Sequence, residues 1–94
     1  AAVLTDKGNV YTGVCIDTDC SLGMCAERNA LSTMISHGEY AARKVAAVTK
    51  TGEILPPCGA CREFMMQLGS PENIEILVDS DTAVALKDLV PYPY

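Results

Sequence analysis

Hydrophobic and polar positions in the first third of the chain change from a strand-like to a helix-like pattern. Two short apolar runs, residues 2–5 and 10–16, flank a turn sequence at residues 6–9, which predicts a β-hairpin. From Cys25 the apolar positions recur at helical spacing, and Gly38 supplies a stop signal. The apolar stripe consists of Ala30, Leu31, Met34 and Ile35. The pattern therefore predicts two strands followed by one helix.

The remainder of the chain predicts three more strands and a second helix. Residues 45–49 form a short unbroken apolar run, which is typical of a strand buried on both faces. A helix is predicted to begin near Cys58 and to end at Gly69, and strands are predicted at 74–78 and 82–86. The order is β-β-α-β-α-β-β, with no repeat, linker or low-complexity stretch.

The length of 94 residues is enough for one small domain, spanning residues 1–94. Such a domain buries only about 60–65% of the surface that its unfolded chain exposes. Extra stabilisation is therefore expected from a metal, from subunit contacts or from both. The chain begins at Ala1 inside an apolar stretch without an initiator Met, so further N-terminal sequence is expected.

The charge pattern excludes two classes of partner. Twelve acidic residues against seven basic ones give a net charge of −5, and no basic stripe is present to neutralise phosphates. Nucleic acid is therefore not an expected partner. No apolar run approaches the roughly 18 residues that cross a bilayer, and no signal peptide is recognisable. We expect no membrane partner and a cytoplasmic location.

The cysteine pattern predicts a zinc site. Five cysteines are an odd number, and in a reducing compartment metal binding is favoured over disulfides. The sequence Cys25-Ala26-Glu27 is followed thirty residues later by a Pro-Cys-x-x-Cys motif that contains Cys58 and Cys61. Three thiolates hold one zinc ion and leave the fourth tetrahedral position open for water. This combination is typical of zinc-dependent nucleobase deaminases, in which the glutamate is the general acid/base and not a ligand.

The predicted helices add electrostatic support to this site. Cys25 and Cys58 each open a helix, so unpaired N–H groups point at the metal and stabilise the thiolates. Three thiolates on one divalent zinc leave a net charge of −1, which a nearby cation should offset. Arg28 is the first candidate and Arg62 the second. A solvated surface arginine remains the alternative for each.

The chain resembles, nearly end to end, the small homotetrameric cytidine deaminase family, including blasticidin-S deaminase. The matching segments are residues 23–30 (GMCAERNA), 57–62 (PCGACR) and 88–94 (DLVPYPY). The resemblance implies an α/β three-layer sandwich in which helices flank a five-stranded mixed sheet. It implies a homotetramer with active sites at subunit contacts, and an N-terminal helix and a substrate-packing aromatic upstream of Ala1.

The resemblance also implies a hydrolytic reaction on a small-molecule nucleoside, in which cytosine becomes uracil and ammonia is released. Glu27 would move protons between water, the ring nitrogen and the leaving amino group. The backbone around Ala26 and Pro57 would hold the edge of the base. Tyr94 occupies the place of an aromatic that reaches a neighbouring subunit's pocket, although a surface or interface tyrosine explains it equally well.

The sugar-binding positions depart from the family pattern. Cytidine deaminases carry Asn and Glu on the second strand, where this chain has Cys15 and Asp17, and the loop at 17–24 is one residue shorter. Cysteine is a poor hydrogen-bond partner for a hydroxyl, and aspartate is shorter than glutamate. The prediction is a deaminase of a cytosine nucleoside, with a modified nucleoside such as blasticidin S as the alternative substrate.

Three other interpretations remain open from the sequence. Cys20 could complete a structural four-cysteine zinc site, although Glu27 would then have no role. Cys58 and Cys61 could form a thioredoxin-like redox dithiol. The chain could also be a non-catalytic module on the same scaffold. The paired motif is more specific than either half, and it favours the enzyme.

Overall fold

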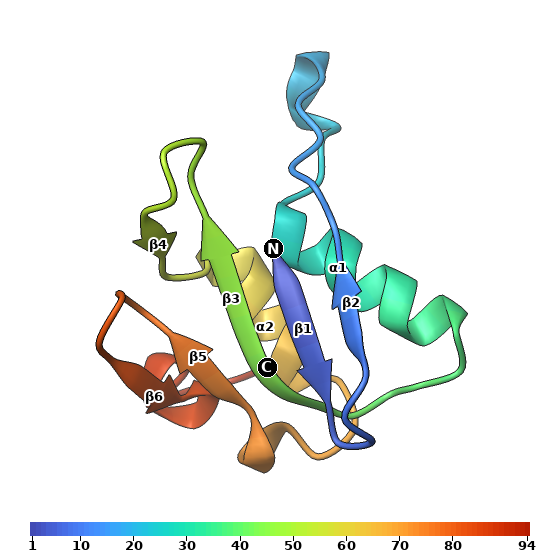
Figure 1. Cartoon of the computed structure of the whole chain (residues 1–94), viewed down its shortest axis with the longest axis vertical. Helices are drawn as coiled ribbons and strands as arrows, with labels where there is room; N and C mark the ends of the chain where they lie inside the picture. Colours follow the sequence, from blue (N-terminus) through green and yellow to red (C-terminus); the bar gives the residue numbers. More distant parts are fainter.

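Five strands form one mixed sheet in the order β2-β1-β3-β5-β6 (Figure 1). The computed structural model describes all residues, 1–94. The strands are β1 (Ala2–Thr5), β2 (Val10–Thr12), β3 (Ala42–Val48), β5 (Glu75–Leu77) and β6 (Ala83–Ala85). Only β3 and β5 pair in parallel, and the other pairs are antiparallel. The predicted five-stranded mixed sheet is confirmed.

A sixth strand, β4 (Ile54–Leu55), pairs with the end of β3 outside this path. It was not predicted from the sequence, because two residues are too few to show a strand period.

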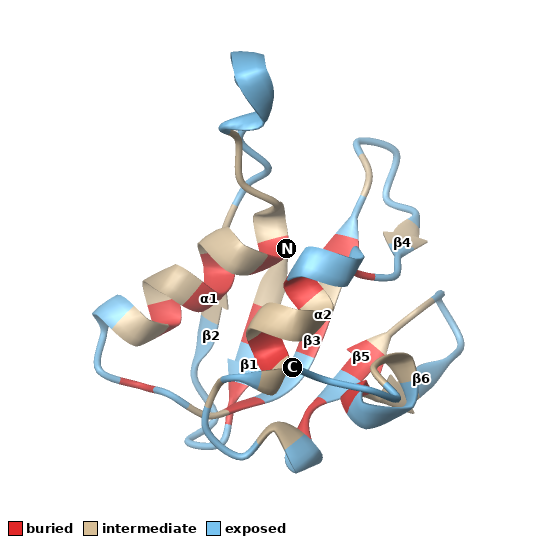
Figure 2. Ribbon diagram, turned by 180° about the vertical axis from the view of Figure 1, so that it is seen from behind, coloured by how far each residue is buried: buried red, intermediate tan, exposed pale blue.

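The helices α1 (Ala26–Ser36) and α2 (Gly59–Met66) lie on the same face of the sheet (Figures 1 and 2). Short 3-10 helices are η1 (Asp19–Ser21), η2 (Pro71–Asn73) and η3 (Leu86–Leu89). The core lies between sheet and helices. Its largest fully buried side chains include Val3, Leu31, Met34, Val45, Met65, Ile76 and Leu86. With 11 and 8 residues, α1 and α2 are too short to cross a membrane.

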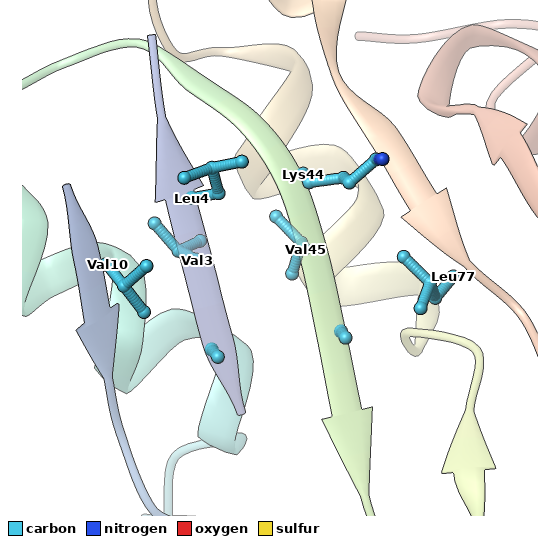
Figure 3. A pocket seen from close by; sticks show the side chains of 8 residues that line it. Val3, Leu4, Val10, Lys44, Val45 and Leu77 are labelled. Atoms are coloured by element: carbon cyan, nitrogen blue, oxygen red, sulfur yellow. The ribbon is translucent and has the colours of Figure 1, made fainter. Parts of the chain in front are cut away.

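The opposite face of the sheet carries no helix. Leu4 and Val10 are exposed there, and with Lys44 and Leu77 they line a shallow apolar hollow (Figure 3). Residues 1–94 thus form two layers of the expected three-layer sandwich. The prediction that β3 is buried on both faces is wrong for the same reason: Val45 and Ala47 are buried, whereas the alternate positions point to the uncovered face.

The second strand was predicted to end at residue 16, but in the structure it ends at Thr12. Gly13 still exchanges hydrogen bonds with Ala1, beside the start of β1, and residues 14–16 have no partner in β1. Gly13 also packs closely against α1, because a Cβ atom there would lie 2.3 Å from the backbone nitrogen of Ala30. Beyond this contact the chain leaves the sheet as an arm, residues 13–25, that projects from the body (Figure 1). A single β-bridge between Ile16 and Met24 holds the two sides of the arm together.

The remaining boundary differences are small. Strand β3 begins at Ala42, three residues before the predicted start, because pairing with β1 continues past the apolar run. Helix α2 ends at Met66, three residues before Gly69. Leu68 still packs against the core from the following turn, which explains why the apolar pattern extends beyond the helix.

A buried polar cluster ties the β1–β2 hairpin to the segment after α1. The carboxylate of Glu39, only 6% exposed, accepts hydrogen bonds from the side-chain amide of Asn9 (2.9 Å) and from the hydroxyl of Tyr11. The hydrogen bond from Tyr11, followed by the influence of the Thr5 hydroxyl, holds the pKa of Glu39 below its usual value. No sequence pattern indicated this cluster, because Asn9 and Glu39 are 30 residues apart.

Candidate metal centre

Cys25 and Cys58 occupy the N-cap positions of α1 and α2. Both have extended backbone conformations, and neither side chain caps its own helix by a hydrogen bond. Cys61 follows within the first turn of α2 and is fully buried. The prediction that two helix N-termini present cysteines to one site is therefore confirmed.

The three sulfur atoms of Cys25, Cys58 and Cys61 all lie within 4.8 Å of one another. The sulfur atoms of Cys25 and Cys58 are 3.6 Å apart. Tetrahedral zinc with Zn–S bonds of about 2.3 Å requires sulfur atoms about 3.8 Å apart. The cluster therefore fits a zinc ion with three protein ligands and a fourth position open for water.

The geometry argues against two alternatives. Cys20 lies in η1, exposed at the end of the arm, and is not part of the cluster, so the four-cysteine site is wrong. A simple dithiol is also disfavoured, because Cys25 places a third thiol against the Cys58–Cys61 pair.

The thiols of Cys58 and Cys61 differ in acidity. The backbone N–H of Cys61, at the start of α2, lowers the pKa of Cys58. Burial raises the pKa of Cys61, and the neighbouring Cys58 and Glu27 raise it further. Cys58 is therefore the more acidic of the two thiols, and the charge of a bound metal would favour deprotonation of Cys61.

Glu27 lies in the first turn of α1 with only 8% of its surface exposed. Its Oε2 atom accepts a contact from the Cys61 sulfur at 3.9 Å. The carboxylate thus lies beside the sulfur of Cys61 without belonging to the group of three cysteines. This is the placement that a group moving protons to and from a metal-bound water requires.

The two predicted cations have different places. The thiols of Cys25, and secondarily Cys61, raise the pKa of the Arg28 guanidinium, whose buried Nε has no hydrogen-bond partner. The side chain of Arg62 instead donates to two backbone carbonyls, at Pro57 (2.8 Å) and Leu89 (3.5 Å). Arg28 alone has the position expected of a cation that offsets thiolate charge.

A groove of about 200 Å³ lies next to Cys25, between the arm and the start of α1. Cys15 and Asp17 line it, as does Arg28. Thr18 and Ser21 add hydroxyl groups that the sequence did not single out, because they belong to a loop without periodicity. The structure thus brings the predicted sugar-end residues to the metal centre.

The other predicted substrate-binding residues flank the centre or lie apart from it. Ala26 is the first residue of α1, and Pro57 is buried directly before Cys58. The side chain of Tyr94 is fully exposed and does not line the groove, and its backbone N–H donates to the Glu63 carboxylate at 2.7 Å.

Comparison with known proteins agrees with this site. Residues 1–77 match the family model of the cytidine and deoxycytidylate deaminase zinc-binding region. A cytidine deaminase of Halalkalibacterium halodurans is 41% identical over 70 residues, which are 72% of this chain and 52% of that protein. A cytidine deaminase of Mycobacterium tuberculosis is 33% identical over 93 residues, 97% of this chain and 68% of that protein.

The fold gives the same result. The crystal structure of cytidine deaminase from Mycobacterium tuberculosis superimposes with a TM-score of 0.88 at 30% identity, over 99% of this chain and 75% of that chain. The chain spans about half to two thirds of the length of the curated relatives that it matches. Its three-thiol cluster, its fold and the match over residues 1–77 place it in the cytidine and deoxycytidylate deaminase zinc-binding family.

Proposed function

We propose that this chain is a zinc-dependent hydrolase that deaminates a cytosine nucleoside to the uracil form with release of ammonia. The observation that carries the proposal is the buried carboxylate of Glu27 beside the three-thiol cluster. Family membership and the curated relatives named cytidine deaminases support it.

The proposed chemistry needs a metal and one proton carrier. Cys25, Cys58 and Cys61 would hold the zinc ion, which when bound would supply a water of lowered pKa at the site. Glu27 would carry protons from water to the ring nitrogen beside the reacting carbon and to the departing amino group. Burial keeps the Glu27 carboxylate away from bulk water, so that it exchanges protons with the bound substrate.

Arg28 and the backbone of the residues next to Cys25 and Cys58 complete the proposed site. The positive charge of Arg28 beside the thiols offsets their negative charge. The backbone at Ala26 and Pro57 is proposed to hold the base edge. The Pro57 carbonyl already accepts one hydrogen bond from Arg62, and its second lone pair stays available.

The groove next to Cys25 is the proposed binding site for the sugar end. Cys15 and Asp17 line it, so a thiol and a short carboxylate would face the substrate hydroxyls. A designed polar contact contributes about 1–3 kcal/mol to discrimination. Because Cys15 and Asp17 would pair only weakly with the sugar hydroxyls, a second candidate substrate is a modified cytosine nucleoside such as blasticidin S.

A substrate panel tests both candidates. Ammonia release and loss of ultraviolet absorbance are measured on the zinc-loaded protein with cytidine, deoxycytidine, cytosine and blasticidin S. Turnover of any cytosine compound supports the deaminase, and the absence of turnover of all four contradicts it. Efficient cytidine turnover that Cys15→Asn does not improve would contradict the modified substrate.

We further propose that residues 1–94 act as one domain, in a cytoplasmic homotetramer. The exposed apolar side chains support assembly: Leu22 at the end of the arm and Val10 on the sheet are both largely exposed. In a tetramer, Tyr94 would be free to reach a neighbouring subunit, because its side chain is exposed.

A further inference from the structure

Arg62 holds both peptide groups that flank Cys58. Its backbone N–H donates to the Cys58 carbonyl at 3.0 Å, which is the first hydrogen bond of α2. Its side-chain Nε donates to the Pro57 carbonyl at 2.8 Å. The two carbonyls belong to the peptide planes before and after the Cys58 Cα atom. Because peptide groups are planar, fixing both planes fixes φ and ψ of Cys58, and with them the direction of its Cα–Cβ bond.

The Pro57 carbonyl depends on a side chain for this bond. It lies before the helix, so no N–H of α2 is aligned with it in the helical ladder. Pro57 is buried, and a buried carbonyl without a partner is costly. The Arg62 side chain supplies that partner from one turn further along the helix.

A second contact anchors the guanidinium from the other side. Its Nη1 atom lies 3.5 Å from the carbonyl of Leu89, the last residue of η3. Leu86 fixes η3 in the core, where it is fully buried. The planar fork of an arginine spans two such acceptors at once, whereas a lysine offers a single flexible ammonium group.

We propose that Arg62 is a positioning residue for the metal centre: it orients Cys58 toward zinc through the Pro57 carbonyl, and not through its charge. The proposal rests on the proposed zinc site. It assigns to Arg62 a different role from Arg28, which lies against the thiols themselves. Partners of this kind behind a metal ligand typically contribute 10- to 100-fold to metal affinity.

The test compares zinc release from the holoprotein into excess chromogenic chelator for wild type, Arg62→Ala, Arg62→Lys and Glu63→Ala. Glu63 is the matched control, because it is the next residue of α2 and its carboxylate accepts a hydrogen bond from the backbone N–H of Tyr94, not from a group next to Cys58. We expect zinc release to be at least tenfold faster in both Arg62 variants and unchanged in Glu63→Ala. Arg62→Lys keeps the charge but loses the Nε donor, so it separates the two roles.

Three results would overturn the proposal: release from Arg62→Ala within twofold of wild type, wild-type release from Arg62→Lys, or equally fast release from Glu63→Ala. If Arg62→Ala does not fold, the lysine variant decides by itself. Equal unfolding midpoints of the zinc-free proteins would show that the faster release is not a general loss of stability. A wild-type protein that binds no zinc would refute the proposed function as well, whereas a zinc-binding wild type with insensitive variants refutes only the role of Arg62.

Discussion

At the scale of single residues, the proposed reaction depends most directly on Glu27. Replacing it with Gln keeps the size and burial of the side chain but removes its ability to accept a proton. Zinc content and the unfolding midpoint should stay near wild type, because the three cysteines and their helices are unchanged. Deamination should fall by about 10²- to 10⁴-fold, the usual contribution of a general acid/base.

The measurement is single-turnover deamination together with metal analysis of the same samples. Glu63→Gln serves as the control, because it changes a carboxylate on α2 that contacts the backbone of Tyr94. Wild-type turnover by Glu27→Gln would refute the assigned role of Glu27. Loss of zinc in this variant would show instead that the carboxylate supports the metal.

At the scale of secondary-structure elements, two contacts decide how the hairpin, the arm and α1 fit together. Gly13 lets the chain approach the backbone of α1 closely. From Gly13 the chain continues into the arm, whose residues line the groove next to Cys25. The Glu39 cluster joins the other end of the hairpin to the segment after α1. Each contact predicts a stability change that can be measured.

Gly13→Ala should destabilise the protein by about 1–3 kcal/mol, as expected when an extra methyl group is forced into a packed region. The new Cβ would lie 2.3 Å from the Ala30 backbone nitrogen, so the strand or the helix has to move. Gly59→Ala is the matched control, because a Cβ there meets nothing within 4 Å. Denaturant unfolding measures both, and equal stability of the two variants would contradict the packing argument.

Glu39→Gln should lower stability at neutral pH and reduce its dependence on acid. The folded-state pKa of Glu39 is depressed, first by the Tyr11 hydroxyl, so the carboxylate contributes stability above its unfolded pKa, near 4.5. That contribution disappears as the pH falls through the lower, folded-state pKa. The unfolding midpoints of wild type and variant should therefore converge between neutral pH and strongly acidic pH.

Thermal unfolding across that pH range measures the effect, with Glu72→Gln as the control at an exposed position. Parallel curves for wild type and Glu39→Gln, with a constant gap at every pH, would show that the ionised carboxylate is not what stabilises the cluster.

At the scale of the whole molecule, the fold leaves much apolar surface uncovered. Only 16 of 94 residues are buried, so the core is small even for a chain of this length. Leu4 and Val10 on the helix-free face of the sheet are exposed, as is Leu22 on the arm. A monomer with this surface is prone to associate.

We therefore expect light scattering to give about four times the mass of one chain, and dilution to lower both the mass and the unfolding midpoint together. Leu22→Ser, at the end of the arm, should weaken the assembly, whereas Lys50→Ser, at another exposed loop position, should not. A monomeric mass at concentrations where the protein deaminates its substrate would contradict the tetramer.

Local patterns in the sequence were enough to predict most of the helices and strands and the type of metal ligand. Helix α1 was predictable because its stripe of Ala30, Leu31 and Met34 has helical spacing, and these residues are buried as expected. The three cysteines that cluster in the structure were predictable because two short motifs mark them, Cys-Ala-Glu at Cys25 and Pro-Cys-x-x-Cys at Cys58 and Cys61. Within each of these short motifs, and within the helical stripe, spacing along the chain translates directly into geometry.

Which side chains from distant segments come into contact could be seen only in the tertiary structure. It separated Arg28, which lies against the thiols, from Arg62, which holds backbone carbonyls, although each follows a cysteine motif in the sequence. It also brought Glu39 to Asn9 and left one face of β3 uncovered. Periodicity reports only which side of an element is apolar, whereas these outcomes depend on which groups meet across the fold.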